Sequence, residues 1–306
     1  MLLKIILMGI AKAGKTSILL ALDNKTEEFT KVKPTPSISY NQILWAGFSI
    51  ALWDVGGQKV YLKKFLLEND RYLLGLNAIF FVISVEEEDS FKDAFTLLKN
   101  LVDFLEKMKL NVSISFFLHK LDPNRREMEI FQKNEKELRS KVAKIMGRRP
   151  YEVFTTSIYD RLSIVRAFTA TIQKFVPQYD LILSRLQDLS QEFSSPMVLI
   201  LDENSNTVGE WHDPKDTRVD VQLFTEICFS FSKIISRRIY PDLNLLEMSP
   251  AWEIAAVPFL AGSKVYIGFV QIARNAVAEG TAVRAQLLAK REDFGKMLDL
   301  FNLPKQ

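Results

Sequence analysis

One cysteine and two histidines are the only soft metal ligands, other than methionine, in this chain of 306 residues. A single cysteine excludes an intrachain disulfide, and Cys228 stands in an apolar, helix-like segment where a buried small side chain is expected rather than a nucleophile. These residues cannot supply the ligand count of a usual zinc site. The composition fits a protein of a reducing cytoplasm.

Long hydrophobic runs are also absent. The most apolar stretch, residues 72–85, is shorter than the roughly 20 residues that a membrane-spanning helix requires, and it predicts a helix end followed by a buried strand. The N-terminus lacks the signals of a secretory leader, and Leu2 stands where myristoylation needs glycine. Contact with a membrane is therefore expected only through a partner protein.

Neither sign of charge predominates. Forty basic and 37 acidic residues leave a net charge of +3, and the basic pairs are scattered along the chain. A nucleic-acid-binding surface is therefore not expected. The hydrophobic fraction of 48% is that of an ordinary globular protein, and the length predicts two domains.

Residues 1–177 alternate between short apolar runs and longer amphipathic stretches. Six runs predict strands: Leu2–Met8, Ser39–Leu44, Phe48–Trp53, Ala78–Ser84, Ser113–Leu118 and Glu152–Thr155. Three stretches predict helices: Phe91–Met108, Glu127–Ile145 and Ser163–Phe175. This alternation predicts an α/β domain with a mostly parallel six-stranded sheet and helices on both faces. Such sheets bind ligands at the carboxyl ends of their strands.

The pattern changes after Pro177, and residues 178–306 predict a second, smaller α/β domain. Its expected elements are, in order, a helix at Leu181–Phe193, a hairpin at 197–202 and 207–211, a helix at Val219–Arg238, strands at Trp252–Pro258 and Lys264–Ile272, and a helix at Thr281–Phe301.

The segment GIAKAGKTS, Gly9–Ser17, matches the pattern G-x-x-x-x-G-K-[ST] and lies between a predicted strand and a predicted helix. Its backbone N–H groups and the helix N-terminus are expected to surround the phosphates of a nucleotide. The residues of this cradle are Gly9, Ala11, Lys12, Ala13, Gly14, Lys15, Thr16 and Ser17. Lys15 would reach the β- and γ-phosphates, and Thr16 would place its hydroxyl on Mg²⁺. A glycine turn that only caps a helix is the alternative.

The segment WDVGGQ, Trp53–Gln58, closes the third predicted strand. Asp54 would hold the Mg²⁺ shell, the backbone of Gly57 would approach the γ-phosphate, and Gln58 would orient an attacking water. Asp-x-x-Gly alone is ordinary turn chemistry. Its place downstream of a phosphate loop favours the nucleotide site.

Two further polar segments follow buried strands. LHKLDP, residues 118–123, presents a histidine, a lysine and an aspartate, and TTSIYD, residues 155–160, follows the last predicted strand of the first domain. A run of four acids, Glu86–Asp89, is expected to stabilise the start of the helix near Ser90.

Together these motifs resemble the small GTPases. WDVGGQ resembles the Arf and Rag branches of that superfamily, and HKLD resembles the variant of the base motif that Rag GTPases carry. The resemblance implies that Asp122 selects guanine by accepting hydrogen bonds from N1 and the exocyclic amine. The stem of Lys120 would cover the base. His119 takes the place of an asparagine that ties the base loop to the phosphate loop, and Ser157 and Ile158 would donate backbone N–H groups to guanine O6.

The resemblance also implies a switch I loop with a threonine for Mg²⁺ and the γ-phosphate. Thr35, between two prolines, is the matching residue, and Ser37 is the alternative. Hydrolysis of GTP would then depend on Gln58, Lys15 and Thr35, with GTP or GDP and Mg²⁺ as the bound species. Because no arginine lies within Lys31–Ser39, turnover is expected to be slow without a partner.

Rag and Gtr GTPases carry a C-terminal roadblock domain, a longin-like α/β fold whose order of elements is the one expected from Leu181 onward. The resemblance implies pairing with a second roadblock protein, as a homodimer or a heterodimer, and regulation by GTPase-activating and exchange proteins. It also implies nutrient or growth signalling from the cytoplasm, peripheral to a lysosomal or vacuolar membrane in a eukaryote. WDVGGQ favours a Rag A-like branch, whereas TSIYD favours a Rag C-like branch.

Two other functions fit parts of the sequence. A roadblock-paired scaffold with a structural nucleotide would not require the water-positioning Gln58. An ATP-using P-loop kinase would not require Asp122, and the chain lacks an Arg-rich lid-like segment.

Overall fold

The computed structural model describes residues 2–23, 25–35, 38–45, 48–58, 75–176, 179–213, 215–216, 220–237, 244–249, 252–261, 264–273, 289 and 295–296. The chain divides into two compact units, Met1–Leu44 with Phe48–Thr171, and Trp45–Gly47 with Ile172–Gln306. These units differ from the predicted domains mainly in the segment 172–177, which holds the short 3₁₀ helix η4 (Gln173–Phe175).

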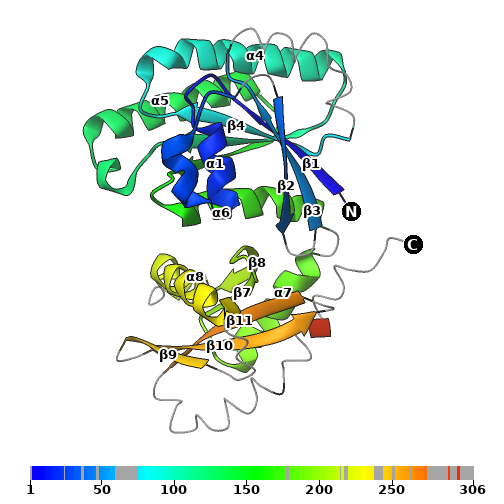
Figure 1. Cartoon of the computed structure of the whole chain (residues 1–306), viewed down its shortest axis with the longest axis vertical. Coiled ribbons are helices and arrows are strands. Elements are labelled where there is room, and N and C mark those ends of the chain that lie inside the picture. Colours follow the sequence, from blue (N-terminus) through cyan, green and yellow to red (C-terminus); the bar gives the residue numbers. More distant parts are fainter. Residues whose placement is uncertain are drawn as a thin grey trace. The chain divides into compact units, whose positions relative to one another are not determined.

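The first unit is a six-stranded sheet. Its strands are β1 (Leu2–Met8), β2 (Ile38–Trp45), β3 (Phe48–Val55), β4 (Ala78–Ser84), β5 (Ser113–His119) and β6 (Tyr151–Thr156). They lie in the order β2-β3-β1-β4-β5-β6, and the pairs β3–β1, β1–β4, β4–β5 and β5–β6 are parallel (Figure 1). The predicted strands are confirmed, with ends shifted by one or two residues.

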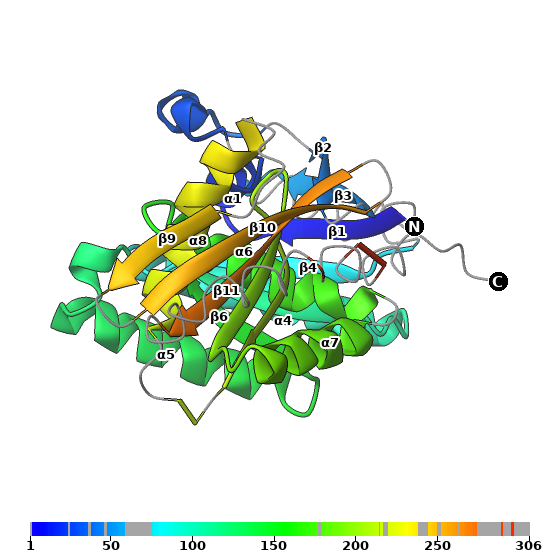
Figure 2. The same cartoon turned by 90° about the horizontal axis from the view of Figure 1, so that it is seen from below.

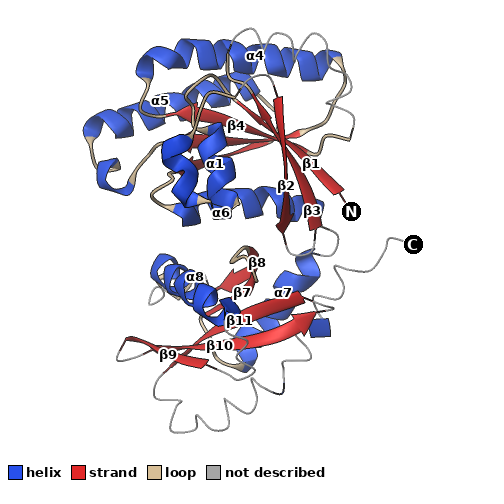
Figure 3. Cartoon of the chain, in the orientation of Figure 1, coloured by secondary structure: helices blue, strands red, loops and turns tan. Residues whose placement is uncertain are grey.

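Helices cover both faces of this sheet (Figure 3). They are α1 (Lys15–Leu22), α4 (Phe91–Lys107), α5 (Glu129–Met146) and α6 (Arg161–Ile172). Successive residues of a strand point to opposite faces, and the phenylalanines of β4 show the result. Phe81 belongs to the core beneath α4 and α5, whereas Phe80 contacts Phe168 of α6 with ring centroids 5.9 Å apart. The strand is buried on both sides, which explains its unbroken apolar sequence.

The topology brings the candidate motifs to one edge of the sheet. Because parallel strands share a carboxyl edge, the segments after β1, β3, β5 and β6 all emerge there. Central β1 lies between β3 and β4. The strand order therefore reverses direction at β1, and in open α/β sheets ligands bind at the carboxyl end of the strand where this reversal occurs.

The second unit contains a five-stranded sheet in the order β8-β7-β11-β10-β9. Its elements are α7 (Tyr179–Glu192), β7 (Met197–Asp202), β8 (Thr207–His212), α8 (Val221–Arg237), β9 (Asn244–Ser249), β10 (Trp252–Ala261) and β11 (Lys264–Ala273). The strand pairs are antiparallel, and β10 and β11 run side by side over their whole length (Figure 2).

Two helices of the second unit pack on opposite faces of its sheet. Leu199 belongs to the core that contains Phe224 of α8. The next residue, Ile200, pairs with Gly209, and a Cβ placed on Gly209 would lie 2.8 Å from Leu186 of α7. Adjacent strand residues therefore face different helices, and Gly209 is needed because α7 lies so close to β8.

One strand was missed in the sequence, and one predicted element is outside the described residues. The run Asn244–Ser249 forms edge strand β9, although its sequence, NLLEMS, lacks both β-branched residues and a clean alternation. Pairing with β10 determines its conformation. The helix predicted at 281–301 lies almost entirely outside the described residues.

Replacing Phe116 with alanine should lower the free energy of unfolding of the first unit by about 3–5 kcal/mol. This ring is fully buried and lies against Phe81 and Tyr151, with centroids 5.7 Å and 5.8 Å away. Met128→Ala is the matched control because Met128 is 51% exposed. Denaturant unfolding would contradict the packing if the two variants lost similar stability.

Candidate functional site

The phosphate loop joins β1 to α1 as the sequence predicts. Gly14 is the N-cap of α1 with φ +96°, a left-handed conformation that glycine adopts at least cost. The side chain of Lys15 turns back over the loop, and its Nζ donates to the carbonyls of Gly9 at 2.9 Å and Ile10 at 3.0 Å. Burial lowers the pKa of Lys15 to about 8, although the negative charge of Asp54 opposes that shift.

Three of the predicted metal ligands meet at the carboxyl end of β3. The Thr16 hydroxyl donates to Asp54 Oδ2 at 2.8 Å, and the Thr35 hydroxyl donates to the same oxygen at 2.9 Å. The two hydroxyl oxygens lie 3.1 Å apart. The phosphate loop, the segment that contains Thr35 and strand β3 thus each bring one side-chain oxygen to a single point. The alternative residue, Ser37, lies outside the described residues.

The chemistry of this group fits Mg²⁺. Two hydroxyls and one carboxylate are hard oxygen donors, the type that Mg²⁺ prefers. Asp54 is fully buried, and its Oδ1 has no hydrogen-bond partner within the described residues. A buried carboxylate oxygen without a partner is costly, and a cation would remove that cost. Among the described residues, no three or more His, Cys, Asp or Glu side chains cluster as a metal site.

The segment after β3 approaches the phosphate loop closely. A Cβ on Gly57 would overlap the backbone of Ile10 and Ala11, so only glycine fits there without movement. Gln58 follows and is exposed. The structure therefore brings Gly57 against the loop, whereas Gln58 projects where solvent can reach it.

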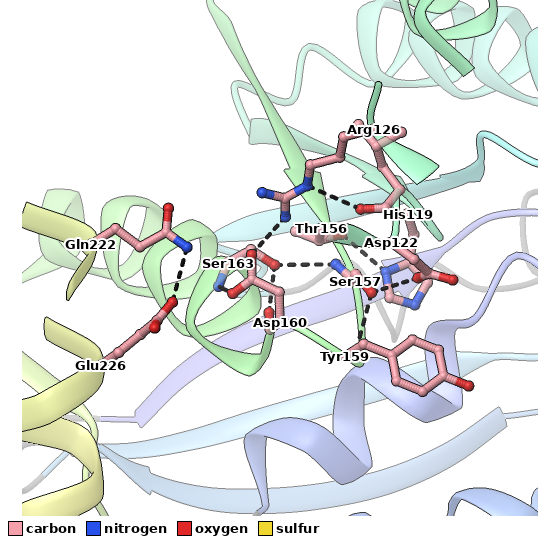
Figure 4. Close-up of polar contacts among 11 residues, drawn as sticks. His119, Asp122, Arg126, Thr156, Ser157, Tyr159, Asp160, Ser163, Gln222 and Glu226 are labelled. Atoms are coloured by element: carbon pink, nitrogen blue, oxygen red, sulfur yellow. Dashed lines mark hydrogen bonds and ion pairs between the residues drawn. The ribbon is translucent and has the colours of Figure 1, made fainter. Parts of the chain in front are cut away.

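Two of the predicted base-binding residues, Asp122 and Ser157, are hydrogen-bonded to each other (Figure 4). Ser157 Oγ donates to Asp122 Oδ1 at 2.5 Å and accepts from the backbone N–H of Tyr159 at 3.1 Å. The backbone N–H of Ser157, which the sequence predicts to donate to guanine O6, donates to Ser163 Oγ at 3.1 Å in this structure. The roles of Ser157 and Ile158 toward guanine stay predictions.

His119 connects the base loop with the phosphate loop. Its Nδ1 lies 3.0 Å from Thr156 Oγ1, and its Cδ2–Nε2 edge packs so closely on Gly14 that a Cβ there would overlap the ring. The ring is 2% exposed. Burial, reinforced by the positive charge of Lys120, lowers the pKa of His119 to about 3. The imidazole is therefore neutral at physiological pH.

The acidic run after β4 has a different role from the one expected. Glu87 Oε1 accepts from Lys120 Nζ at 2.6 Å, and Glu86 Oε1 accepts from Arg125 at 2.7 Å. These acids thus hold cations of the base loop instead of only stabilising the start of α4, because β4 and β5 are neighbours and their following loops lie together. Lys120 itself has a positive φ of 67°.

Sequence reasoning missed the residues that support this loop from α6. Asp160 accepts from Arg126 at 2.6 Å through Oδ2 and from the backbone N–H of Ser163 at 3.1 Å through Oδ1. The second bond is an N-cap of α6. An aspartate directly before a helical pattern was the available signal. Tyr159, 76% exposed, extends from the same segment.

The site combines three features: a phosphate loop after a central parallel strand, a group of side-chain oxygens that fits Mg²⁺, and a base loop with Asp122. Together they define a P-loop nucleotide-binding protein of the small-GTPase type. The conserved region of the Gtr1/RagA G proteins matches residues 4–247. The chain belongs to this Gtr1/RagA G protein family, which binds guanine nucleotides.

Curated relatives are distant but cover most of the chain. The GTP-binding protein gtr2 of Schizosaccharomyces pombe is 30% identical over 76% of this chain and 73% of its own length. The GTP-binding protein GTR2 of Saccharomyces cerevisiae is 23% identical over 74% and 65%, respectively. The Ras-related GTP-binding protein C of Homo sapiens is 26% identical over 63% and 48%. The matched regions thus span between 48% and 73% of these relatives.

No helix among the described residues is long and apolar enough to cross a membrane.

The neutral, buried His119 should make stability depend on pH. Its pKa is lower in the folded chain than in the unfolded chain, so the unfolded state binds the proton first as the pH falls. Stability attributable to this residue is complete above pH 6.5 and is lost progressively between 6.5 and about 3. We expect a loss of about 1.4 kcal/mol per pH unit between pH 6 and 4 beyond that of His119→Asn.

Denaturant unfolding of both proteins across this range measures the difference, because the asparagine variant retains every carboxylate. Parallel curves for the two proteins would show that His119 is not buried in its neutral form.

Proposed function

We propose that this protein is a molecular switch that binds GTP and GDP with Mg²⁺ and slowly hydrolyses GTP. The observation that supports it best is the meeting of Thr16, Thr35 and Asp54. These residues come from three separate segments, and one of them is the switch I loop. Loss of the γ-phosphate would therefore remove a contact of Thr35. A bound nucleotide can order or release the loop that contains Thr35 in this way.

Guanine selection rests on Asp122. Its carboxylate would accept hydrogen bonds from N1 and the exocyclic amine of guanine, a pair of donors that adenine lacks. The hydrogen bond from Ser157 fixes Oδ1 in advance, which lowers the cost of ordering the carboxylate on binding. The ion pair of Lys120 with Glu87 restrains the lysine, whose stem would then lie over the base.

Hydrolysis would use the residues at the phosphate end. Lys15 would bind the β- and γ-phosphates, the backbone of Gly57 would contact the γ-phosphate, and Gln58 would orient the attacking water. Thr16, Thr35 and Asp54 would hold Mg²⁺, which when bound supplies charge that offsets the negative phosphate oxygens. The exposed Gln58 and the absence of arginine from Lys31–Ser39 support slow intrinsic turnover and acceleration by a partner.

The second unit would serve dimerisation with a Rag-like or roadblock protein, as a homodimer or a heterodimer. Its antiparallel sheet with helices on both faces supports a roadblock-like domain. Exchange and GTPase-activating proteins would read the nucleotide state, in the cytoplasm or peripheral to a lysosomal or vacuolar membrane. The similarity to Gtr2 and to Ras-related GTP-binding protein C favours the Rag C-like branch. The chain nevertheless has Gln58, the residue proposed to orient water for hydrolysis.

A structural scaffold is the second candidate function. A nucleotide that never turns over would still need the base loop and the phosphate loop, but it would not need Gln58 next to Gly57. The placement of Gly57 against the phosphate loop favours a protein that responds to the γ-phosphate.

Chromatography of the nucleotide released from purified protein tests the proposed function. We expect GDP or GTP, close to one per chain, and light scattering should give the mass of a dimer or of a complex with a paralogue. Adenine nucleotide would overturn the function, and a guanine-loaded monomer would remove the dimerisation part alone.

Replacing Gln58 with leucine should slow single-turnover GTP hydrolysis by about tenfold to a hundredfold, because the variant cannot orient the water. GTP affinity should stay within about threefold, since Gln58 is not a predicted phosphate or base ligand. Gln42→Leu, on the exposed part of β2, is the control. Equal hydrolysis by the wild-type and Gln58→Leu proteins would overturn the role of Gln58, and no hydrolysis by either protein would favour the scaffold.

A further inference from the structure

A groove of about 950 Å³ lies between helices α4 and α5, which cover the same face of the first sheet (Figure 1). Its lining residues come from 88–103 on one side and 137–145 on the other. At a rise of 1.5 Å per residue, the part of α4 that lines it, Phe91–Asp103, is about 18 Å long. The groove is therefore long enough for about three turns of another helix.

The floor of the groove is apolar. Phe91 and Val102 are buried there, whereas Phe95 and Ile145 are only partly buried. The rings of Phe91 and Phe95 meet edge to face, with centroids 6.4 Å apart. Partly exposed apolar side chains in a concave surface favour a partner that removes them from water. The floor can thus accept apolar side chains of another helix.

The rim of the groove is rich in lysine. Each helix contributes two exposed lysines, and the four are Lys92, Lys99, Lys141 and Lys144. In the parts of the chain that the structure describes, none of them forms an ion pair. Three acids also line the groove. Glu88 is compensated by Lys133, 3.6 Å away, and Asp103 and Glu137 remain. Four positive charges therefore face two uncompensated negative charges.

The spacing of the charges on α5 would allow them to pair within the helix. Glu137 and Lys141 are four residues apart, a spacing at which a glutamate and a following lysine attract each other, yet they form no ion pair in the described structure. Glu135 and Arg139, with the same spacing on the same helix, pair at 2.8 Å. The charges beside the groove are thus available to a partner.

We propose that this groove is the docking site of a partner protein that inserts an acidic amphipathic helix between α4 and α5. The apolar face of that helix would cover Phe95 and Ile145, and its carboxylates would pair with the rim lysines. No residue of 31–39 or 53–58 lines the groove, so the docking site is separate from the segments proposed to respond to the γ-phosphate. The inference goes beyond the nucleotide switch and does not depend on it.

A negatively charged membrane fits these observations less well. The surface of a bilayer is broad, so it would contact the exposed ammonium groups of the rim and leave the partly buried Phe95 and Ile145 uncovered. A helix is only about 10–12 Å wide and can enter the space between two others. The shape of the groove therefore favours a protein segment.

Binding of a fluorescent synthetic peptide to the full chain tests the proposal. The peptide has about 14 residues, with leucine along one helical face and glutamate beside that face. We expect saturable binding by fluorescence anisotropy. Two control peptides should bind at least about tenfold more weakly: one with lysine in place of glutamate, and one of the same composition with the leucines distributed around the helix. Absence of binding by the acidic peptide, or equal binding by all three, would overturn the proposal.

Reversing the charge of two rim lysines tests where the peptide binds. Lys99→Glu combined with Lys141→Glu should weaken binding of the acidic peptide about tenfold. Lys107→Glu combined with Lys136→Glu is the matched control, because it changes the charge equally on exposed residues of the same two helices that do not line the groove. Equal loss in both double variants would mean that the peptide responds to net charge, and the groove would not be its site.

A matched pair of phenylalanines tests the floor. Phe95 and Phe104 are both partly buried on α4 against the same core, but only Phe95 lines the groove. Phe95→Ala and Phe104→Ala should lose comparable stability in thermal unfolding. Only Phe95→Ala should bind the peptide about tenfold more weakly. The same loss of binding in Phe104→Ala would contradict docking in the groove.

Two further measurements separate this proposal from its alternatives. The chain should not sediment with vesicles of phosphatidylserine and phosphatidylcholine, and vesicle binding without peptide binding would assign the lysines to a membrane instead. Guanine nucleotide binding should be unchanged in every groove variant. A chain that binds the acidic peptide but no guanine nucleotide would overturn the proposed switch and leave the docking site in place.

Discussion

Two hydrogen bonds to a single carboxylate oxygen unite the phosphate end of the site. Asp54 Oδ2 accepts from Thr16, which begins α1, and from Thr35, which lies in switch I. Because Asp54 is buried at the end of β3, its carboxylate is held by the sheet and does not move with the loops. The rigid sheet therefore provides the fixed point against which a mobile ligand and a loop can be ordered.

The base end is held by a separate set of contacts, and His119 connects the two ends. Its neutral ring packs on Gly14 and pairs with Thr156, so β5, β6 and the phosphate loop meet at one side chain. Asparagine could satisfy the hydrogen bond to Thr156, but an imidazole also fills the space above a residue that has no side chain. The left-handed Gly14 is thus required twice, by the loop geometry and by the ring.

The motifs predicted from the sequence occupy one sheet edge because short-range pattern determines strands and helices, and parallel pairing then determines where their ends meet. Local sequence signals do not show which side chains form hydrogen bonds or ion pairs with each other. Sequence spacing alone does not identify the partners in three of these contacts. They are the hydrogen bond from Ser157 to Ser163, the ion pair of Lys120 with Glu87 and the helix cap at Asp160. Edge strand β9 was missed for the same reason, since its pairing partner and not its composition makes it a strand.

The strength of the contacts at Asp54 is compatible with the reversible switch proposed above. A hydrogen bond to a charged group contributes about 1.5–3 kcal/mol when it forms, and Thr35 donates one such bond. Proline restricts the backbone on either side of Thr35 in the sequence, so fixing this residue costs less entropy than fixing an ordinary loop. The hydrogen bond between Thr35 and Asp54 therefore contributes at most about 3 kcal/mol to the ordering of this loop. A free-energy difference of that size is what differential contact with a γ-phosphate can reverse, whereas a loop fixed by a buried apolar core would stay closed in both nucleotide states.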